Sequence, residues 1–147
     1  MEDKNEAQSL REIIRVLERK LGMLNDFEAS CCGVTFTQCH ALVEIGRAGN
    51  ISLNDLADLL GLDKSTMSRT INTLVNNNMV IREIDPADRR YISIKLTGDG
   101  ERTFREIEAN MEDYFTKVYH AIPEAKREQV IESLRLLFTA LLQNDCC

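Results

Sequence analysis

The sequence predicts a mainly α-helical chain with one small β-hairpin in its middle. Three observations support this fold class. Apolar residues recur every three or four positions through most of the chain, and only two prolines interrupt it. After residue 79 this spacing gives way to two short β-branched runs. The 147 residues amount to a single domain.

The first two helices follow from apolar spacing. Leu10, Ile13 and Leu17 are separated by steps of three and four, which predicts an amphipathic helix from about residue 6 to residue 25. The stretch EASCCGV is expected to end it as an inter-helix loop. A second helix is expected after Thr37.

A helix-turn-helix is predicted next. Two short helices, residues 52–60 and 64–77, are joined by a three-residue turn that begins with Gly61, which can adopt a positive φ. Burial of Met67 and Ile71 on one stripe of the second helix turns a polar face outward. The polar residues on and around that face are Lys64, Ser65, Thr66, Ser68, Arg69 and Asn72.

Such a face suits a DNA groove. A major groove is wide enough for one helix and offers patterns of donors and acceptors. The short hydroxyls and the backbone N–H groups at the helix start suit phosphates, whereas Arg69 and Asn72 suit base edges. A polar helix face alone is usually only solvated, so the interpretation depends on the hairpin that follows.

The hairpin adds cations to this region. VIREI and YISIKL are the expected strands, and DPADRR is the turn. Arg89 and Arg90 at an exposed tip could reach a minor groove, whose negative potential attracts guanidinium groups. Asp88 is expected to pair with Arg90 and hold it in position. Residues 47–102 contain 8 Lys/Arg and 8 Asp/Glu, so this segment is neutral overall. The chain as a whole has a net charge of −6, which comes from the residues before and after this segment.

Long helices close the chain. Thr97 is expected to cap a helix that extends to about Ala121, and Pro123 lies near the start of the last helix. An apolar stripe follows one side of that helix. Its members are Val130, Leu134, Leu137, Phe138 and Leu141.

Three stretches carry a resemblance to a known family. They are VTFTQCHAL, SLNDLADLLGLDKSTMSRTINTLVNNNMVIRE and DPADRRYISIKLTGDG, in which Leu96, Thr97 and Gly100 form a Leu-Thr-x-x-Gly motif. The chain resembles MarR-family transcriptional regulators, which are winged helix-turn-helix dimers. The resemblance implies a DNA-binding lobe at 35–100 and a helical dimerisation region at 1–30 and 101–147.

The resemblance also implies a function. A homodimer would bind a palindromic operator in double-stranded DNA, most often as a repressor, with Arg90 in the minor groove and Asp88 as its positioning partner. A small ligand, such as a phenolic compound, or an oxidant would release the DNA. No cofactor is required. The alternative from the residues is a winged helix that binds another protein and not DNA.

The cysteines suggest a sensor. Cys31, Cys32, Cys39 and His40 lie within ten positions and could bind zinc or another thiophilic ion, or form a thiol switch. Zinc-sensing members of the family use a loop Cys and a Gln-acid-His sequence, and here Cys39 replaces the acid after Gln38, which leaves room for arsenite. The competing interpretation is that these cysteines are small buried hydrophobes.

Several classes are disfavoured. No segment has the roughly 18 to 20 apolar residues of a membrane helix, and the polar, acidic N-terminus is unlike a signal peptide. A cytoplasmic location is therefore expected. No nucleophile–base pair and no Gly-rich phosphate loop stand out, so the chain is not expected to be an enzyme.

Overall fold

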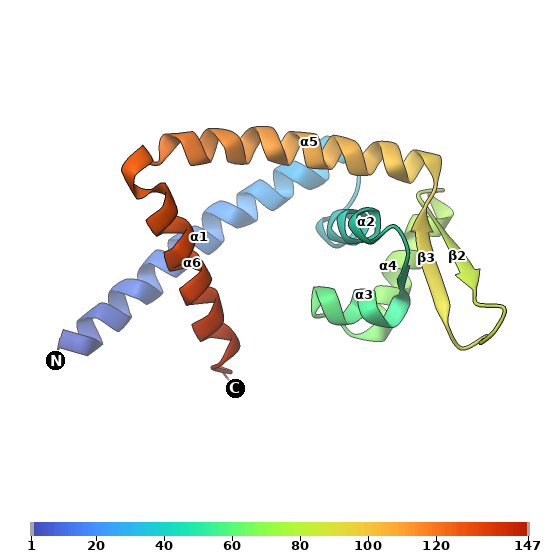
Figure 1. Ribbon diagram of the computed structural model, residues 1–147, viewed down its shortest axis with the longest axis horizontal. Helices are drawn as coiled ribbons and strands as arrows, with labels where there is room; N and C mark the ends of the chain where they lie inside the picture. Colours follow the sequence, from blue (N-terminus) through green and yellow to red (C-terminus); the bar gives the residue numbers. More distant parts are fainter. Residues whose placement is uncertain (1, 147) are drawn as a thin grey trace. The chain divides into compact units, whose positions relative to one another are not determined.

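The structure is a computed structural model that describes residues 2–146, with side chains at 2–22 and 33–146. Helices dominate it, and they are joined by one small antiparallel sheet (Figure 1). The elements in chain order are α1 (Glu2–Cys32), α2 (Phe36–Ala48), β1 (Ile51–Ser52), α3 (Leu53–Leu60), α4 (Lys64–Asn76), β2 (Val80–Ile84), β3 (Ile92–Leu96), α5 (Gly98–Ala121), η1 (Glu124–Lys126) and α6 (Arg127–Leu142). The chain forms two compact units, of which the first ends at Glu108 and the second begins at Ala109.

The helix-turn-helix is present as predicted. Ser52 caps α3 by accepting a hydrogen bond from the backbone N–H of Asp55 at 3.0 Å. Gly61 ends α3 in the left-handed region with φ 65°, a conformation that costs little without a Cβ atom. Met67 and Ile71 of α4 are fully buried, as their spacing predicted. The polar side of α4 is therefore left at the surface.

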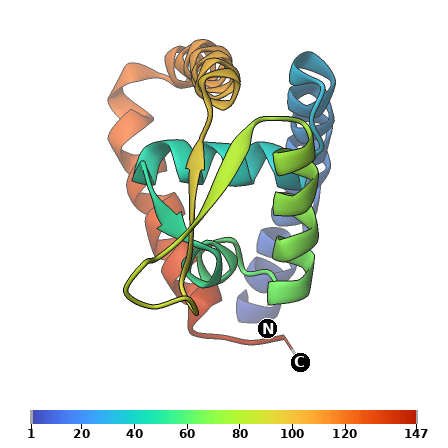
Figure 2. The ribbon, with the colours of Figure 1, turned by 90° about the vertical axis from the view of Figure 1, so that its right-hand side faces the viewer.

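The predicted hairpin is confirmed, but it belongs to a three-stranded sheet. β2 and β3 pair antiparallel from Val80↔Leu96 to Ile84↔Ile92. The two-residue strand β1 adds to the other edge of β3, which gives the order β1-β3-β2. The strand β1 was not predicted, because two residues carry no periodicity and only pairing with β3 makes them a strand. Figure 2 shows α2 passing behind this sheet.

A single hydrophobic core lies within the first unit. Thirteen hydrophobic side chains are buried among those that the structure describes, and all of them fall between residues 34 and 107. They come from the segment before α2 and from α2, α3, α4, β2, β3 and α5. They are Val34, Cys39, Ala41, Leu42, Ile45, Leu56, Ala57, Met67, Ile71, Leu74, Val80, Ile94 and Ile107. The core therefore fixes α4 and the hairpin on one rigid body.

Two helix boundaries differ from the prediction. The backbone of α1 continues through EASCC to Cys32, and Gly33 with φ 70° follows. Cys31 and Cys32 therefore lie in the last helical turn and not in a loop. The α2 helix begins at Phe36, before the predicted start, because Thr35 and Gln38 form a capping box. The cluster EASCCGV does not end α1 at its first residue, and the cap of α2 is Thr35 and not Thr37.

The long helix α5 has the predicted bounds. The Thr97 hydroxyl accepts a hydrogen bond from the backbone N–H of Gly100 at 3.0 Å, which caps the helix start. At the other end, within the second unit, the Arg127 guanidinium donates to the carbonyls of Tyr119 and Ile122, both at 3.1 Å. Side chains therefore satisfy backbone groups at both ends of α5.

Large apolar side chains stay exposed outside the core. On α1, Ile13 and Val16 are 59% and 53% exposed. On α6, Leu134 and Phe138 are 53% and 62% exposed, and the second unit has no fully buried side chain among those described. These faces lack the burial that stabilises an amphipathic helix in water.

Candidate nucleic-acid interface

The start of α4 is organised by Asp63. Its carboxylate accepts hydrogen bonds from the backbone N–H of Thr66 at 2.6 Å and from the hydroxyls of Ser65 at 2.8 Å and Thr66 at 3.0 Å. These donors lower the pKa of Asp63 from 3.8 to about 2, with the Thr66 N–H contributing most. The helix start therefore holds a fixed negative charge.

This arrangement changes the part that the two hydroxyls can play. Ser65 and Thr66 are predicted to donate to phosphates, yet in the free protein both hydroxyls donate to Asp63. The Asp63 carboxylate also occupies the place at which a helix N-terminus attracts an anion. Phosphate contacts by these hydroxyls therefore require them to leave the cap.

The remaining predicted residues of α4 lie as expected. Lys64, Arg69 and Asn72 are exposed, and Ser68 is half-buried. The Arg69 guanidinium donates to the Thr66 hydroxyl at 3.4 Å, which leads its side chain back along the outer face of the helix. The exposed side of α4 thus presents two cations and one amide.

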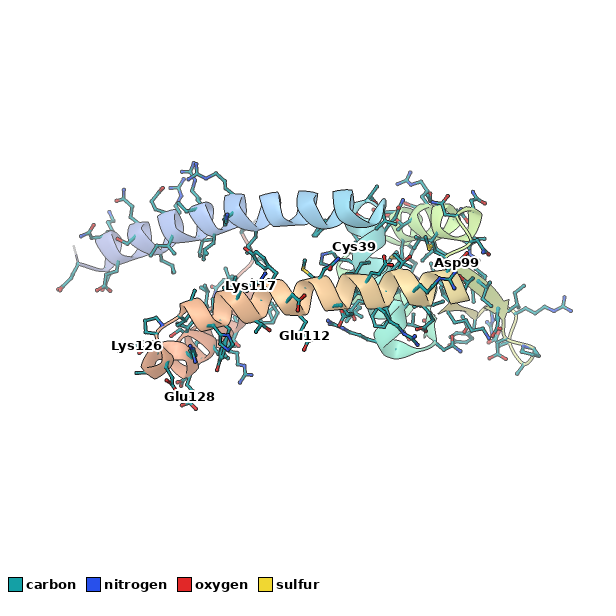
Figure 3. All side chains as sticks on the ribbon, turned by 90° about the horizontal axis from the view of Figure 1, so that it is seen from above. Cys39, Asp99, Glu112, Lys117, Lys126 and Glu128 are labelled. Carbon is teal, nitrogen blue, oxygen red and sulfur yellow. The ribbon has the colours of Figure 1, made fainter. Side chains whose placement is uncertain are left out.

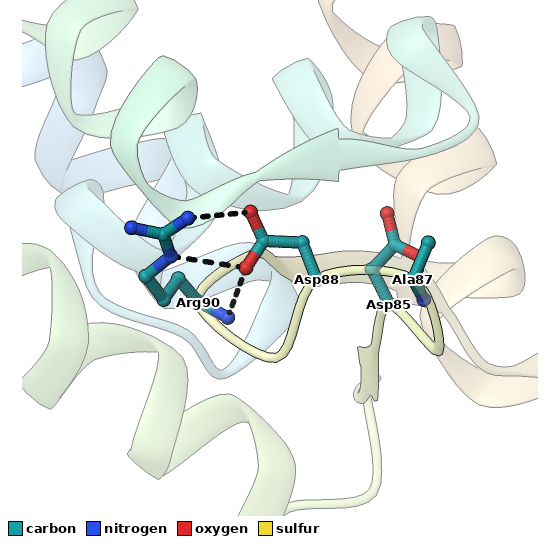
Figure 4. Close-up of polar contacts among 4 residues, drawn as sticks. All are labelled: Asp85, Ala87, Asp88 and Arg90. Atoms are coloured by element: carbon teal, nitrogen blue, oxygen red, sulfur yellow. Dashed lines mark hydrogen bonds and ion pairs between the residues drawn. The ribbon is translucent and has the colours of Figure 1, made fainter.

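Hydrogen bonds between Asp88 and Arg90 order the tip of the hairpin. The Asp88 carboxylate accepts from the Arg90 backbone N–H at 3.0 Å and from the Arg90 Nε at 3.1 Å (Figure 4). A second bond joins Arg90 Nη2 to the other carboxylate oxygen at 3.4 Å. The predicted pairing of these two residues is confirmed. The Arg90 side chain is still 91% exposed, so the pair aims a solvated guanidinium outward.

A second Asx contact shapes the same tip. The Asp85 carboxylate accepts from the Ala87 backbone N–H at 2.9 Å, and the Asp85 N–H donates to the Tyr91 carbonyl at 3.1 Å. Arg89 is exposed in the middle of the turn that Asp88 and Arg90 form. The tip is therefore held by local hydrogen bonds and not by the core.

Arg82 is a site residue that sequence reasoning missed. It lies on β2 opposite the buried Ile94, so its side chain continues the face that packs on the core. Its guanidinium donates to the Ser68 carbonyl of α4 at 3.4 Å. An exposed cation thus bridges the hairpin and α4. The position of Arg82 within VIREI does not predict this contact, because the contact depends on how β2 packs against α4.

These cations are largely unneutralised. Among the side chains that the structure describes, no carboxylate lies within ion-pair distance of Lys64, Arg69, Arg82 or Arg89. On the hairpin, Arg90 pairs with Asp88 and Lys95 pairs with Glu83. The other ion-paired arginines, such as Arg47 with Glu108 at 3.0 Å, lie outside α4 and the hairpin. Eight other Lys and Arg side chains of the described residues, on α1, α5, η1 and α6, also lack an ion pair. The feature that distinguishes α4 and the hairpin is therefore the grouping of exposed cations there and not their lack of partners.

The proposed sensor residues do not all come together. Cys39 is 1% exposed and belongs to the core. His40 is exposed, and its ring lies edge-on to the ring of Phe36, with the two ring centroids 4.1 Å apart. The side chains of Cys31 and Cys32 lie outside the described residues. Among the side chains that are described, no three of His, Cys, Asp and Glu gather as metal ligands. The sensor stays a prediction from the sequence.

Comparison with known proteins identifies the family. The model of the MarR family matches residues 33–90, which include the helix-turn-helix, β2 and most of the hairpin turn. The multiple antibiotic resistance protein MarR of Salmonella typhimurium is 30% identical over 96 residues, which cover 65% of this chain and 67% of that protein. The chain belongs to the MarR family of transcriptional regulators. This is a family of regulators and not of enzymes.

Other relatives agree with this MarR-family assignment. The helix-turn-helix-type transcriptional regulator YsmB of Bacillus subtilis is 27% identical over 118 residues, which cover 80% of this chain and 77% of that protein. The crystal structure of Streptococcus pneumoniae FabT in complex with DNA superposes with a TM-score of 0.82 at 18% identity, over 91% of this chain and 98% of that one. The MarR-type fold is therefore shared. Within residues 2–146, no helix has the length and apolarity that a bilayer span requires.

Proposed function

We propose that this MarR-family protein is a homodimeric, cytoplasmic repressor that binds a palindromic operator in double-stranded DNA. Each chain offers α4 to a major groove and the hairpin tip to the adjoining minor groove. The similarity to FabT, whose structure was solved with DNA, and to the resistance regulator MarR supports this role.

One observation carries the proposal. Five exposed cations, Lys64, Arg69, Arg82, Arg89 and Arg90, lie together on α4 and the hairpin, in a protein whose net charge is −6. A polyanion would be repelled by most of such a surface and attracted to this part of it. A winged helix that binds only proteins has no need for this concentration of charge.

The residues divide into two roles. Lys64, Ser65, Thr66 and Ser68 are assigned to phosphates, and Arg69 and Asn72 to base edges. At the hairpin, Arg90 enters the minor groove, Asp88 orients it, and Arg89 contacts the backbone. To these we add Arg82, whose remaining N–H donors lie between the two groove contacts and suit a phosphate.

The dimer is proposed from the exposed apolar faces. The dimerisation region would consist of residues 1–30 and 101–147, where α1, the end of α5 and α6 leave large hydrophobic side chains exposed. A twofold axis would place two copies of α4 about 34 Å apart, one helical turn of DNA. The releasing signal, whether a small ligand, a thiol oxidant or a soft metal ion, follows from the sequence alone.

The test is selection of DNA fragments from the chromosome that encodes the protein. Purified protein is mixed with sheared fragments, and bound fragments are recovered and sequenced. We expect one inverted repeat whose half-sites are about 10 base pairs apart, centre to centre. Recovery of no preferred sequence, together with equal affinity for the best fragment and for random duplex, would contradict the proposal in favour of a protein-binding module.

A further inference from the structure

A hydrogen-bonded joint connects the end of the reading helix α4 to the start of α5. The last carbonyls of α4, on Leu74 and Val75, accept from the backbone N–H groups of Met79 at 2.9 Å and Asn78 at 3.0 Å. Thr97, just before α5, then donates to Asn78 and Met79. Its backbone N–H donates to the Met79 carbonyl at 3.0 Å, and its hydroxyl donates to the Asn78 carbonyl at 2.6 Å. Backbone hydrogen bonds thus run from one helix to the other.

Gly100 allows the two segments to come this close. A Cβ atom at this buried position would lie 1.9 Å from the Met79 carbonyl oxygen, so no larger residue fits without moving the backbone. The Thr97 hydroxyl that donates to Asn78 also accepts from the Gly100 N–H. The α5 helix is therefore capped and attached to α4 by the same side chain.

Asn78 adds a lateral bond to this backbone joint. It has φ 60°, and it is the one non-glycine residue of 2–146 in the left-handed region. Its side-chain amide donates to the Asp99 carboxylate at 3.1 Å, and Asp99 pairs in turn with Arg102. Figure 3 shows Asp99 in the first turn of α5. Glycine at position 78 would suit the backbone equally well and would lack this bond.

We infer that Asn78 and Asp99 are positioning residues for DNA binding. The amide–carboxylate bond, added to the two Thr97 bonds, stops rotation about the joint and fixes the direction in which α4 projects from α5. The inference rests on the proposed function, in which α5 leads toward the dimer. Since both half-sites must be read at once, an error in that direction weakens binding to an operator of fixed spacing.

The test compares Asn78→Gly, Asp99→Ala and Asp99→Asn on the selected operator. Asn78→Gly and Asp99→Ala remove the bond, whereas Asp99→Asn keeps an oxygen that accepts from the Asn78 amide. We expect the first two to weaken binding about threefold to tenfold, the equivalent of one hydrogen bond, and Asp99→Asn to bind nearly as wild type. Fluorescence anisotropy with labelled duplex gives the affinities.

A spacing series separates positioning from plain loss of stability. One base pair added between the half-sites turns one of them by about 35°. Wild type should lose most of its affinity for that duplex, whereas Asn78→Gly and Asp99→Ala should lose a smaller factor, because a looser joint follows the rotation. The double variant should be no weaker than either single variant, since both remove the same bond.

Controls fix the interpretation. Glu101→Gln breaks an exposed ion pair with Arg105 in the same part of α5 without touching α4, and it should leave the spacing series unchanged. Circular dichroism shows that each variant is folded. The inference is overturned if Asn78→Gly and Asp99→Ala bind every duplex as wild type does, or weaken all of them by one common factor. A wild-type protein with no preferred duplex contradicts the proposed function itself, and this inference falls with it.

Discussion

At the scale of single residues, Arg90 and Asp88 make the sharpest prediction about DNA binding. Arg90→Ala removes a guanidinium that is 91% exposed and aimed by Asp88, so affinity for specific and random duplex alike should fall about tenfold. The slope of log affinity against log salt concentration should decrease by about 1, because one fewer counterion is released. Anisotropy titrations at several salt concentrations measure both quantities.

Asp88→Ala and Arg15→Ala serve as comparisons for that prediction. Asp88→Ala frees the Arg90 guanidinium from its hydrogen bonds without removing its charge. The loss of DNA affinity should therefore be smaller than for Arg90→Ala, and the salt slope should equal that of wild type. Arg15→Ala removes a cation from α1, 61% exposed and far along the chain from the hairpin, and should change neither quantity. An Arg90→Ala protein with wild-type affinity and slope would refute the minor-groove role.

A second residue-scale prediction concerns pH and Asp63. Because its folded pKa lies near 2, below the ordinary 3.8, ionised Asp63 stabilises the fold fully above about pH 4, and this contribution is lost as the pH falls through 2. Asp63→Asn keeps a capping side chain without the charge. The difference in melting temperature between wild type and Asp63→Asn should therefore be constant from pH 5 to 7 and shrink below pH 4.

Thermal melts followed by circular dichroism from pH 2 to 7 supply that measurement. Asp55→Asn is the matched control, since it changes an exposed first-turn acid of α3 that makes no such cap through its side chain. A wild-type advantage over Asp63→Asn that persists undiminished at pH 2 would show that the cap does not depend on ionisation.

Which residues the sequence predicted correctly depends on the range of their contacts. The pairing of Asp88 with Arg90 was predictable because two positions of one turn determine it. The role of Arg82 was not, because its contact with the Ser68 carbonyl needs β2 and α4 to be packed together first. The hydroxyls of Ser65 and Thr66 were assigned to a phosphate because the sequence does not show that Asp63 engages them.

At the scale of elements, periodicity predicted most of the fold. The bounds of α5 followed from the Thr97 cap, and the two hairpin strands followed from their β-branched runs. The strand β1 did not, because it consists of two residues that pair with β3 only in the folded lobe. The end of α1 was placed too early, since a Gly/Ser/Cys-rich composition is a weaker stop than the positive φ of Gly33.

Arg127 gives the element-scale prediction, at the turn between α5 and α6. Its guanidinium donates to three carbonyls at the end of α5 and lies 5.0 Å from the centre of the Tyr119 ring. Arg127→Ala leaves those carbonyls to water, so the free energy of unfolding should fall by about 1–2 kcal/mol. Arg127→Lys should recover only part of this, because an ammonium lacks the planar fork.

Urea titrations measure these unfolding free energies at one protein concentration. Lys126→Ala is the neighbouring control: its ammonium donates only to the Gln129 side chain at 3.3 Å, so the midpoint should barely move. Equal stability of Arg127→Ala and wild type would mean that α5 needs no cap at this end.

At the scale of the whole molecule, the two units differ in how much they bury. The first contains all the buried hydrophobic side chains that the structure describes, whereas the second has none and leaves nine large hydrophobic side chains of α5 and α6 exposed. Helices of this length are marginal in water without packing on an apolar face. The second unit therefore requires a partner surface, and the apolar stripe of α6 is the first candidate.

The last prediction tests that requirement. Phe138 is 62% exposed on the α6 stripe, and Phe138→Glu places a charge where the proposed dimer buries a ring. Wild type should sediment at twice 16.7 kDa, and the variant should sediment as the monomer, with operator affinity reduced at least about a hundredfold because the two half-sites are no longer bound together. Leu59→Glu is the matched control, since Leu59 is 57% exposed on α3, outside the proposed interface. The Leu59→Glu protein should keep the sedimentation mass of the dimer. A wild-type monomer that binds one half-site as tightly as the full repeat would contradict the twofold arrangement on which the operator geometry depends.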